Sequence, residues 1–270
     1  MKNKKKSFDG KAIYNPKGKA REYSKWACNF HTGCSNNCEY CYCKKGFLGR
    51  TWDIQPRLKK CFVDELDAFN IFKKELQTNI SELRKDGLFF TFTSDPMLPS
   101  TKEFIWDCVC ETVRNEIPVQ LLTKRADFID STIKEFQNKE MVAFGFTLTG
   151  CDELEPDASS NADRIKAMEA LKRLGYRTFA SIEPIINPEA SMAVINACCN
   201  FCDLFKVGVL SGKKEYDKNA ILFMLEQLNG LAKQGVRFYL KDSFVQYINL
   251  DRASLGTGFV TADFNINNIK

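Results

Sequence analysis

Cys34, Cys38 and Cys41 are the residues of this chain whose type and spacing are best suited to chemistry. The pattern Cys-x-x-x-Cys-x-x-Cys puts three thiolates on a tight loop, where they could hold three irons of a [4Fe–4S] cluster, because soft sulfur suits iron. The fourth iron would stay open to an outside molecule. A structural zinc site usually adds a distant second cysteine pair, and a disulfide framework is typical of small secreted chains. The spacing therefore favours iron–sulfur chemistry over both alternatives.

The composition agrees with metal ligation by a protein of a reducing compartment. The 270 residues are 44% hydrophobic and 27% charged, as in an ordinary globular domain. Twelve cysteines argue for metal ligands and buried thiols, and the single histidine, His31, excludes most histidine-based catalysis. No apolar run reaches membrane length, and no signal-peptide core follows the first lysines. We therefore expect a cytoplasmic protein without membrane contact, and the net charge of +5 permits an anionic partner without requiring one.

The elements that must position these cysteines alternate between short apolar strands and amphipathic helices. A polar arm over residues 1–24 precedes a first strand, 26–30, which leads into the cysteine loop. Leucine and phenylalanine at helical spacing predict a long helix over 64–85. Further strands are expected at 88–93, 119–124, 141–148, 177–182, 204–210 and 236–240, and further helices at 102–115, 127–138, 161–174, 189–201 and 218–234.

Repeated β-then-α units of this kind predict an α/β fold with a parallel sheet, that is, a partial or full (β/α) barrel of the TIM type. The barrel domain is expected over residues 25–250, with an irregular tail over 251–270. In such barrels the active site lies at the carboxyl ends of the strands. Polar residues follow the predicted strands at these ends, namely Ser94, Asp95, Lys124, Thr147 and Glu183.

From about Asn29 to Leu210 the chain resembles the radical SAM enzymes, in the branch that contains spore photoproduct lyases and related DNA repair photolyase-like proteins. Besides the cysteine loop, the resemblance rests on short segments in matching order: Phe92–Pro96, Leu122–Lys124, Phe144–Leu148, Leu154–Pro156 with Arg164, and Glu183–Ile186. In radical SAM enzymes the open iron of a [4Fe–4S] cluster binds S-adenosylmethionine (SAM). An electron from the reduced cluster then cleaves SAM to methionine and a 5′-deoxyadenosyl radical.

The resemblance implies a role for each matching residue. Cys34, Cys38 and Cys41 would ligate the cluster, and Lys124 would pair with the SAM carboxylate as a point charge. Glu155 and Arg164 are expected to form a structural charge pair. Further contacts to SAM are assigned to Tyr40, Ser94, Asp95, Thr147 and Glu183. The resemblance also implies a low-potential electron donor of the flavodoxin or ferredoxin type.

One departure from the family concerns the cysteine that returns a hydrogen atom to the repaired base in spore photoproduct lyases. That cysteine lies two residues before the matching serine, where this chain has Phe92. The C-terminal region that grips the DNA lesion has no clear match either. Repair of thymine photoproducts is therefore not expected, and Cys151, just past a predicted strand end, is the candidate hydrogen donor.

These patterns leave three functions open. The leading hypothesis is a radical SAM enzyme that abstracts hydrogen from an organic substrate such as a base of DNA or RNA. The alternatives are a radical SAM enzyme for a peptide or small metabolite, and a non-enzymatic iron–sulfur or zinc protein that binds a partner. A nucleic acid would require surface cations. The candidates are the N-terminal lysines, Lys44, Lys45, Arg50, Arg57, Lys59, Lys60, Lys213, Lys214 and Lys241.

Overall fold

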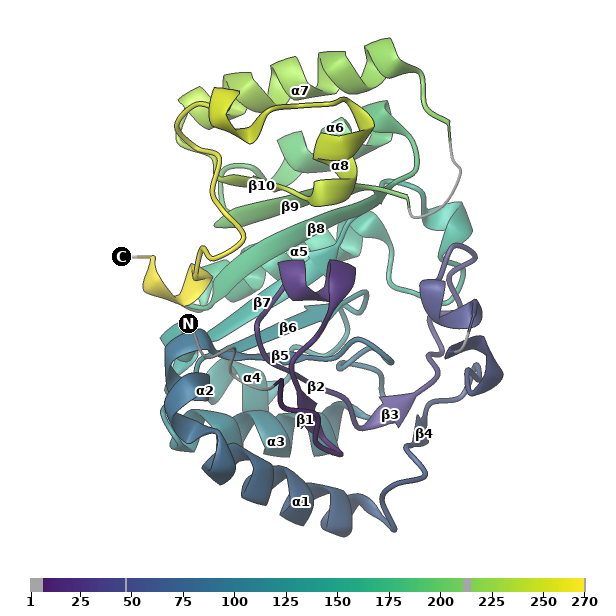
Figure 1. Cartoon of the computed structure of the whole chain (residues 1–270), viewed down its shortest axis with the longest axis vertical. Helices are drawn as coiled ribbons and strands as arrows, with labels where there is room; N and C mark the ends of the chain where they lie inside the picture. The colour runs from purple at the N-terminus through teal and green to yellow at the C-terminus, as the bar shows by residue number, and fades with distance from the viewer. Residues whose placement is uncertain (1–6, 47, 211–214, 270) are drawn as a thin grey trace, which may run out of the picture. The chain divides into compact units, whose positions relative to one another are not determined.

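The computed structural model describes residues 7–46, 48–210 and 215–269 (Figure 1). This part of the chain forms two compact units. The first takes in the described residues of Met1–Ser35 and Cys43–Leu121, and the second those of Asn36–Tyr42 and Leu122–Lys270. The cysteine loop is therefore divided, because Cys34 belongs to the first unit, whereas Cys38 and Cys41 belong to the second.

The sheet of the first unit is mainly parallel. It contains β1 (Ile13–Tyr14), β2 (Ala27–Cys28), β5 (Leu88–Phe90) and the first residues of β6 (Val119–Thr123). β1 runs antiparallel to β2, whereas β2, β5 and β6 pair in parallel. A separate antiparallel pair, which the sequence did not predict, joins β3 (His31–Thr32) to β4 (Arg57–Leu58).

Strand β5 ends at Phe90, earlier than the predicted end at residue 93. The Thr91 hydroxyl donates to the Ser94 carbonyl at 2.7 Å and closes a turn. The Phe92 N–H donates to the side chain of Asn29 at 2.7 Å and not to a neighbouring strand. Since both groups are bonded outside a ladder, the chain leaves the sheet before the predicted SAM residues.

The helices of the first unit are α1 (Glu65–Thr78), α2 (Ile80–Asp86) and α3 (Lys102–Arg114). The helix predicted over 64–85 is thus interrupted at Asn79, whose side chain donates to the Glu75 carbonyl at 2.8 Å. Asp64 caps the start of α1 by accepting the Asp67 N–H, and Gly87 ends α2 with a φ of 77°. α1 and α3 pack against each other (Figure 1).

Phenylalanine side chains form the core of the first unit. Phe30, Phe72 and Phe90 are fully buried, and Phe30 meets the rings of Phe72 and Phe104 edge to face at 5.2 and 5.1 Å. Each fully buried aromatic side chain contributes about 1.5–3 kcal/mol of hydrophobic stabilisation. This core therefore holds β2 and β5 rigidly at the ends from which the Cys34 and Ser94 segments depart.

The second unit has the predicted alternation of strands and helices. The strands β7 (Val142–Thr147), β8 (Arg177–Ile185), β9 (Leu204–Val209) and β10 (Phe238–Leu240) pair in parallel in this order. The helices are α4 (Ser131–Glu135), α5 (Asn161–Arg173), α6 (Pro188–Cys198), α7 (Lys218–Lys233) and α8 (Asp242–Tyr247). Figure 1 shows β8, β9 and β10 side by side, and α6 in contact with α7. The predicted α/β fold with parallel strands is confirmed.

The remaining elements are short 3-10 helical turns, and both the predicted arm and the predicted tail are hydrogen-bonded to their own units. The Glu75 carboxylate accepts the N–H groups of Lys11, Ala12 and Ile13, so the described part of the predicted arm is tied to α1. In the predicted tail, the Val260 N–H donates to the Phe238 carbonyl at 2.8 Å. The turns are Gly18–Glu22, Tyr42–Lys44, Leu48–Arg50, Lys139–Met141, Asp152–Leu154, Arg252–Ser254 and Ile266–Asn268. Among the described residues, no helix is long and apolar enough to cross a membrane.

Candidate functional site

The Cys38–Cys41 turn belongs to the second unit and is held by its backbone. The Cys41 N–H donates to the Cys38 carbonyl at 3.3 Å, which closes the turn. The Glu39 N–H donates to the Leu154 carbonyl at 3.0 Å, which ties the turn to the segment after β7. The Cys38 side chain is buried, and its thiol lies 3.8 Å from the Asn36 carbonyl. Two of the predicted ligands are therefore fixed against one face of the second unit.

Cys34 follows Gly33 in the first unit. Gly33 has a φ of 94°, and a Cβ atom there would lie 2.4 Å from the Asp53 carbonyl oxygen, so only glycine fits. The Cys34 N–H donates to the same Asp53 carbonyl at 3.0 Å. The backbone that leads to the first predicted ligand is therefore fixed by Asp53.

Glu155 lies at the centre of a buried polar network in the second unit. One carboxylate oxygen accepts a hydrogen bond from the Tyr40 hydroxyl, and the other accepts from the Arg164 guanidinium. The side chains of Glu155 and Arg164 are both 0% exposed. Lys124 Nζ lies 3.9 Å from Glu155 Oε1 and 5.4 Å from the centre of the Tyr40 ring. The predicted Glu155–Arg164 charge pair is confirmed, and Tyr40 and Lys124 are its neighbours in the network.

The charges in this network set the protonation of its members. Burial raises the pKa of the Cys38 thiol, and the positive charge of Lys124 opposes this shift. Burial acts to lower the pKa of Lys124, but the negative charges of Cys38 and Glu155 outweigh it, so that this pKa is raised. Burial and the charge of Glu155 raise the pKa of Tyr40. At neutral pH Lys124 is a cation and Tyr40 a neutral donor, and the cation favours the Cys38 thiolate that a metal requires.

Thr147 and Cys151 lie at and after the end of β7, in the same unit. The Thr147 carbonyl accepts a hydrogen bond from Arg164, so the network around Glu155 reaches this strand end. Cys151 is buried, and its N–H donates to the Thr149 hydroxyl at 3.2 Å. The Asn161 side chain accepts the Thr149 N–H at 3.0 Å and fixes the loop further.

Glu183 lies near the end of β8 and pairs with Lys241, which follows β10. The Lys241 ammonium donates to the Glu183 carboxylate, and the Lys241 side chain is only 1% exposed. Gly208 of β9 lies between them, and a Cβ atom there would be 3.0 Å from Glu183 Oε1. The prediction that Lys241 is a surface cation for nucleic acid is therefore wrong, because its side chain is buried and its ammonium is paired with Glu183.

Ser94 and Asp95 lie after β5 in the first unit. The Asp95 side chain accepts the Met97 N–H at 2.9 Å, and its carbonyl accepts the Thr101 hydroxyl at 3.3 Å, so Asp95 shapes the turn before α3. The Ser94 hydroxyl is buried, and none of the described residues forms a hydrogen bond with it. A buried polar atom without a partner costs about 1–3 kcal/mol, so Ser94 is a natural contact for a polar ligand.

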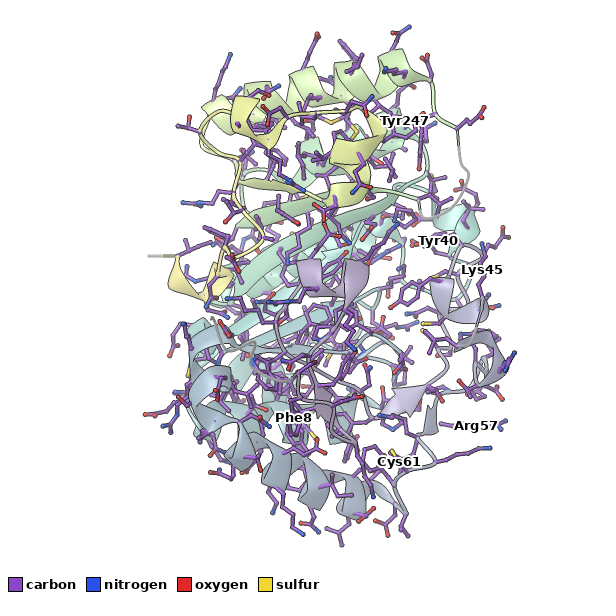
Figure 2. All side chains as sticks on the ribbon, in the orientation of Figure 1. Phe8, Tyr40, Lys45, Arg57, Cys61 and Tyr247 are labelled. Carbon is purple, nitrogen blue, oxygen red and sulfur yellow. The ribbon has the colours of Figure 1, made fainter. Side chains whose placement is uncertain are left out.

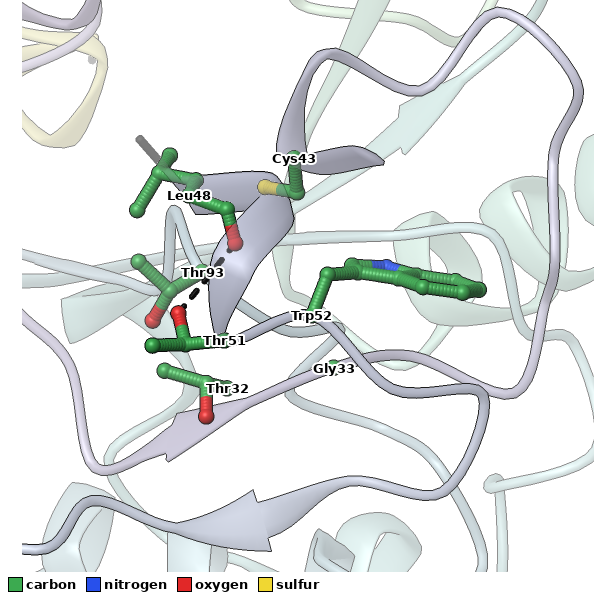
Figure 3. A pocket seen from close by; sticks show the side chains of 7 residues that line it. All are labelled: Thr32, Gly33, Cys43, Leu48, Thr51, Trp52 and Thr93. Atoms are coloured by element: carbon green, nitrogen blue, oxygen red, sulfur yellow. Dashed lines mark hydrogen bonds between the residues drawn. The ribbon is translucent and has the colours of Figure 1, made fainter. Parts of the chain in front are cut away.

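A small pocket in the first unit lies beside the cysteine loop (Figure 3). Figure 3 shows the Thr51 hydroxyl bonded to the Leu48 carbonyl, at 3.2 Å. The Cys43 thiol, which also lines the pocket, lies 3.5 Å from the Phe92 carbonyl. The lining residues are Thr32, Gly33, Cys43, Leu48, Thr51, Trp52 and Thr93. The sequence did not predict this pocket, because its hydroxyls, from Thr32 of β3, Thr51 and Thr93, share no sequence pattern.

The donor chemistry of the chain fits an iron–sulfur cluster. All twelve cysteines, each within the described residues, are thiols and none forms a disulfide. In the part of the chain that the structure describes, no three His, Cys, Asp or Glu side chains come together as a metal site. Cys34 lies in a different unit from Cys38 and Cys41. Cysteine sulfurs suit a soft metal, and the Lys124 cation beside Cys38 favours the thiolate form that a metal requires.

Comparisons with known proteins bear on the fold. No family model matches the chain. It is 22% identical to an uncharacterized protein of Methanocaldococcus jannaschii over 228 residues, which are 82% of this chain and 77% of that protein. Its fold matches a spore photoproduct lyase mutant solved with bound SAM and a dinucleoside spore photoproduct (TM-score 0.57, 18% identity). It also matches SuiB of Streptococcus suis bound to its precursor peptide SuiA (TM-score 0.55, 13% identity).

The chain therefore shares its α/β fold with spore photoproduct lyase and with SuiB, as the predicted resemblance implied. The alignment covers 76% of this chain with the lyase and 82% with SuiB. The chain spans only about 60% of the lyase and about half of SuiB, as the alignments cover 60% and 52% of them.

The structure brings only part of the predicted site together. Cys38, Tyr40 and Lys124 share the network around Glu155 in the second unit, whereas Glu183 lies in a separate pair with Lys241. The links from Tyr40 to Glu155 and from Lys241 to Glu183 join residues 115 and 58 positions apart. Local sequence patterns do not reveal such links. For the link between Tyr40 and Glu155, the sequence offered only the motif at residues 154–156 as an indication.

Proposed function

We propose that this protein is a radical SAM enzyme, which cleaves SAM reductively and uses the radical to take a hydrogen atom from an organic substrate. The observation that carries the proposal is the half-buried cation Lys124, held beside Cys38 and Tyr40 in a chain with the radical SAM fold. A protein that only stores a cluster does not require such a cation. The same observation speaks against a non-enzymatic iron–sulfur or zinc protein.

Cys34, Cys38 and Cys41 are proposed to hold a [4Fe–4S] cluster as thiolates. Such a cluster would supply one-electron chemistry for the reductive cleavage of the SAM sulfonium, with the electron coming from a low-potential donor of the flavodoxin or ferredoxin type. Lys124 is proposed to bind the SAM carboxylate, because its ammonium is charged at neutral pH and its side chain is only 17% exposed. Its position beside Tyr40 would orient the ligand over that ring.

The other predicted SAM contacts offer hydroxyls and carboxylates. The Ser94 hydroxyl has no hydrogen-bond partner in the part of the chain that the structure describes, so a ligand oxygen could complete its hydrogen bonding. Thr147 ends β7 and carries a second hydroxyl. Asp95 and Glu183 stay proposed contacts, although both carboxylates already have partners within the protein.

The direct test is SAM cleavage by the anaerobically reconstituted protein. With dithionite as reductant we expect methionine and 5′-deoxyadenosine in equal amounts, measured by mass spectrometry. The same preparation without iron should form neither product. If a protein that carries its cluster leaves SAM intact, the proposal is wrong.

The substrate we propose first is a base of DNA or RNA. Exposed cations lie in the segment 45–60 of the first unit, where Arg57 projects outward and pairs with Asp53 at 2.6 Å (Figure 2). The spore photoproduct lyase relative was solved with a dinucleoside product. The exposed cations of this segment are Lys45, Arg50, Arg57 and Lys60. Lys213, Lys214 and the N-terminal lysines up to Lys6 lie outside the described residues.

A salt series tests this substrate class. Binding of a short duplex should weaken with a log–log slope near −0.9 per phosphate contacted. Replacing Lys45, Arg50 and Lys60 by Gln should flatten the slope, whereas Lys218→Gln with Lys233→Gln on α7 should leave it unchanged. Absence of binding at low salt would remove the nucleic-acid candidate. A peptide or small metabolite then takes its place, as the match to peptide-bound SuiB suggests.

Cys151 is proposed as the hydrogen donor that quenches the substrate radical. Its S–H bond would give a hydrogen atom to the radical, and the thiyl left behind would regain an electron from the low-potential donor and a proton from water. In deuterated water the wild-type product should therefore carry solvent deuterium. Cys151→Ala should lose this label but keep SAM cleavage, and Cys110→Ala is the control. A label unchanged in Cys151→Ala would contradict this role.

A further inference from the structure

The carboxylate of Glu155 has more partners than a structural ion pair requires. Its Oε1 accepts from the Tyr40 hydroxyl, its Oε2 accepts from Arg164, and Lys124 Nζ lies 3.9 Å from Oε1. The Arg164 guanidinium also donates to the Thr147 carbonyl and lies 3.5 Å from Asp152. One buried carboxylate therefore connects the end of β7, the start of α5 and the cysteine turn.

Such a network costs desolvation free energy, because Glu155 and Arg164 leave water completely. A pair of apolar side chains of similar volume would often be equally stable at this place. The pair alone would also not account for the Tyr40 hydroxyl, which belongs to a different segment of the second unit. The extra contact points to a role for Glu155 in holding that segment.

Tyr40 lies between Cys38 and Cys41, so a constraint on its ring is a constraint on both thiols. The turn is attached to residues 154 and 155 at two points: the Glu39 N–H to the Leu154 carbonyl at 3.0 Å, and the Tyr40 hydroxyl to Glu155. The Lys124 ammonium stands over the Tyr40 ring at 5.4 Å. The ring therefore sits between a carboxylate at its hydroxyl and a cation at its face.

We propose that Glu155 is a positioning residue, which fixes the Cys38–Cys41 turn through Tyr40 and holds Lys124 in place for an anionic ligand. The inference rests on the proposed function, because it assumes that these cysteines hold the cluster. Glu155 itself touches neither the iron nor SAM in this account. Loss of its bond to Tyr40 should make the cluster easier to lose and shift its reduction potential, with the fold intact.

Tyr40→Phe isolates this effect, because it removes only the hydroxyl and leaves the Glu155–Arg164 pair. Without iron we expect the variant to fold but to melt a few degrees lower, because the buried Glu155 Oε1 loses a hydrogen-bond donor. The iron-loaded variant should release its iron to a chelator about tenfold faster than the wild type, which corresponds to an activation free energy lower by about 1.4 kcal/mol. The reduction potential, followed by EPR, should shift as well. Tyr247→Phe is the matched control, since it removes a tyrosine hydroxyl that donates to the Tyr216 carbonyl elsewhere in the same unit (Figure 2).

Glu155→Gln completes a double-mutant cycle. If Glu155 acts through Tyr40, the double variant should release iron no faster than Glu155→Gln alone. If Tyr40→Phe releases iron at the wild-type rate and has the wild-type reduction potential, the inference is wrong. This result decides the matter even if Glu155→Gln does not fold. Failure of the wild-type protein to assemble any cluster would instead overturn the proposed function.

Discussion

Lys124 is the residue outside the cysteine loop on which the proposed chemistry depends most. Lys124→Ala should weaken SAM binding by the value of a hydrogen bond to a charged group, about 1.5–3 kcal/mol, or roughly 10–150-fold. The cluster should still assemble, because all three thiol ligands are kept, although Cys38 loses the cation that favours its thiolate. Calorimetric titration with SAM measures the change. Lys166→Ala is the control, since that side chain is 78% exposed on α5. Equal SAM affinity in Lys124→Ala and Lys166→Ala would show that Lys124 is not the carboxylate contact.

Ser94 allows a sharper distinction between stability and binding. Its buried hydroxyl has no hydrogen-bond partner among the described residues, so Ser94→Ala removes an unsatisfied group and should leave the cluster-free protein as stable as before or more stable. SAM affinity should fall about tenfold if the ligand completes that hydroxyl's hydrogen bonding. Thermal melting and SAM titration give the two readouts. If the Ser94→Ala protein binds SAM with wild-type affinity, the Ser94 hydroxyl is not a SAM contact.

Sequence patterns located these residues but not their partners. Cys38, Tyr40 and Lys124 were predicted from local motifs, and the structure places them in one network. Lys241 was predicted as a surface cation, because lysines are rarely buried. Its partner Glu183 lies 58 positions away, and only the parallel order of β8, β9 and β10 brings the two together.

At the scale of elements, the close approach of β7 and β8 depends on one glycine. A Cβ atom at Gly145 would lie 2.1 Å from the ring of Phe179, its partner in register. Gly145→Ala should therefore lower the free energy of unfolding by about 1–3 kcal/mol, measured by urea denaturation. Gly230→Ala on α7 is the control and should stabilise by about 0.5–1 kcal/mol, because a Cβ atom there meets nothing within 4 Å. A second substitution, Phe179→Leu, removes the ring that the new Cβ atom would meet and should restore part of the lost stability. Unchanged stability in Gly145→Ala, or no recovery in the double variant, would contradict this packing.

His31 on β3 gives the first unit a pH dependence. Burial lowers its pKa to about 4. The unfolded value is about 6.5, so the unfolded state binds more protons between these values, and stability that is complete above pH 6.5 is lost as the pH falls toward 4. The loss between pH 7 and pH 5 should be about 2 kcal/mol. His31→Gln should lack this part of the acid destabilisation in urea titrations, and a pH dependence equal to that of the wild type would contradict the assignment.

The elements were predictable where apolar periodicity extends over many residues. α5, α6 and α7 lie close to their predicted ranges, because each has a long pattern and a capping side chain at its start, Ser160, Asn187 and Asp217. The β3–β4 pair was missed, because two-residue strands are too short for alternation to be visible. The break at Asn79 was missed because the apolar spacing of the predicted helix continues across it.

At the scale of the whole molecule, the fold limits the chemistry without choosing the reaction. The chain matches a lyase solved with a dinucleoside photoproduct and SuiB bound to a peptide, at nearly equal TM-scores of 0.57 and 0.55. What these relatives have in common with this chain is the α/β fold. The substrate must therefore be inferred from the residues around the cysteine loop and tested by experiment. The cytoplasmic location and the domain boundaries at residues 25 and 250 stay predictions.

The proposal that Cys34, Cys38 and Cys41 together hold one [4Fe–4S] cluster can be tested by measuring the iron content of the protein. Anaerobically purified protein should contain about four irons and show the brown absorbance of a [4Fe–4S] cluster. Replacing any of the three cysteines by Ala should abolish that absorbance, whereas Cys61→Ala, at an exposed position of the first unit, should leave it unchanged. Equal iron in the triple variant and the wild type would contradict the account.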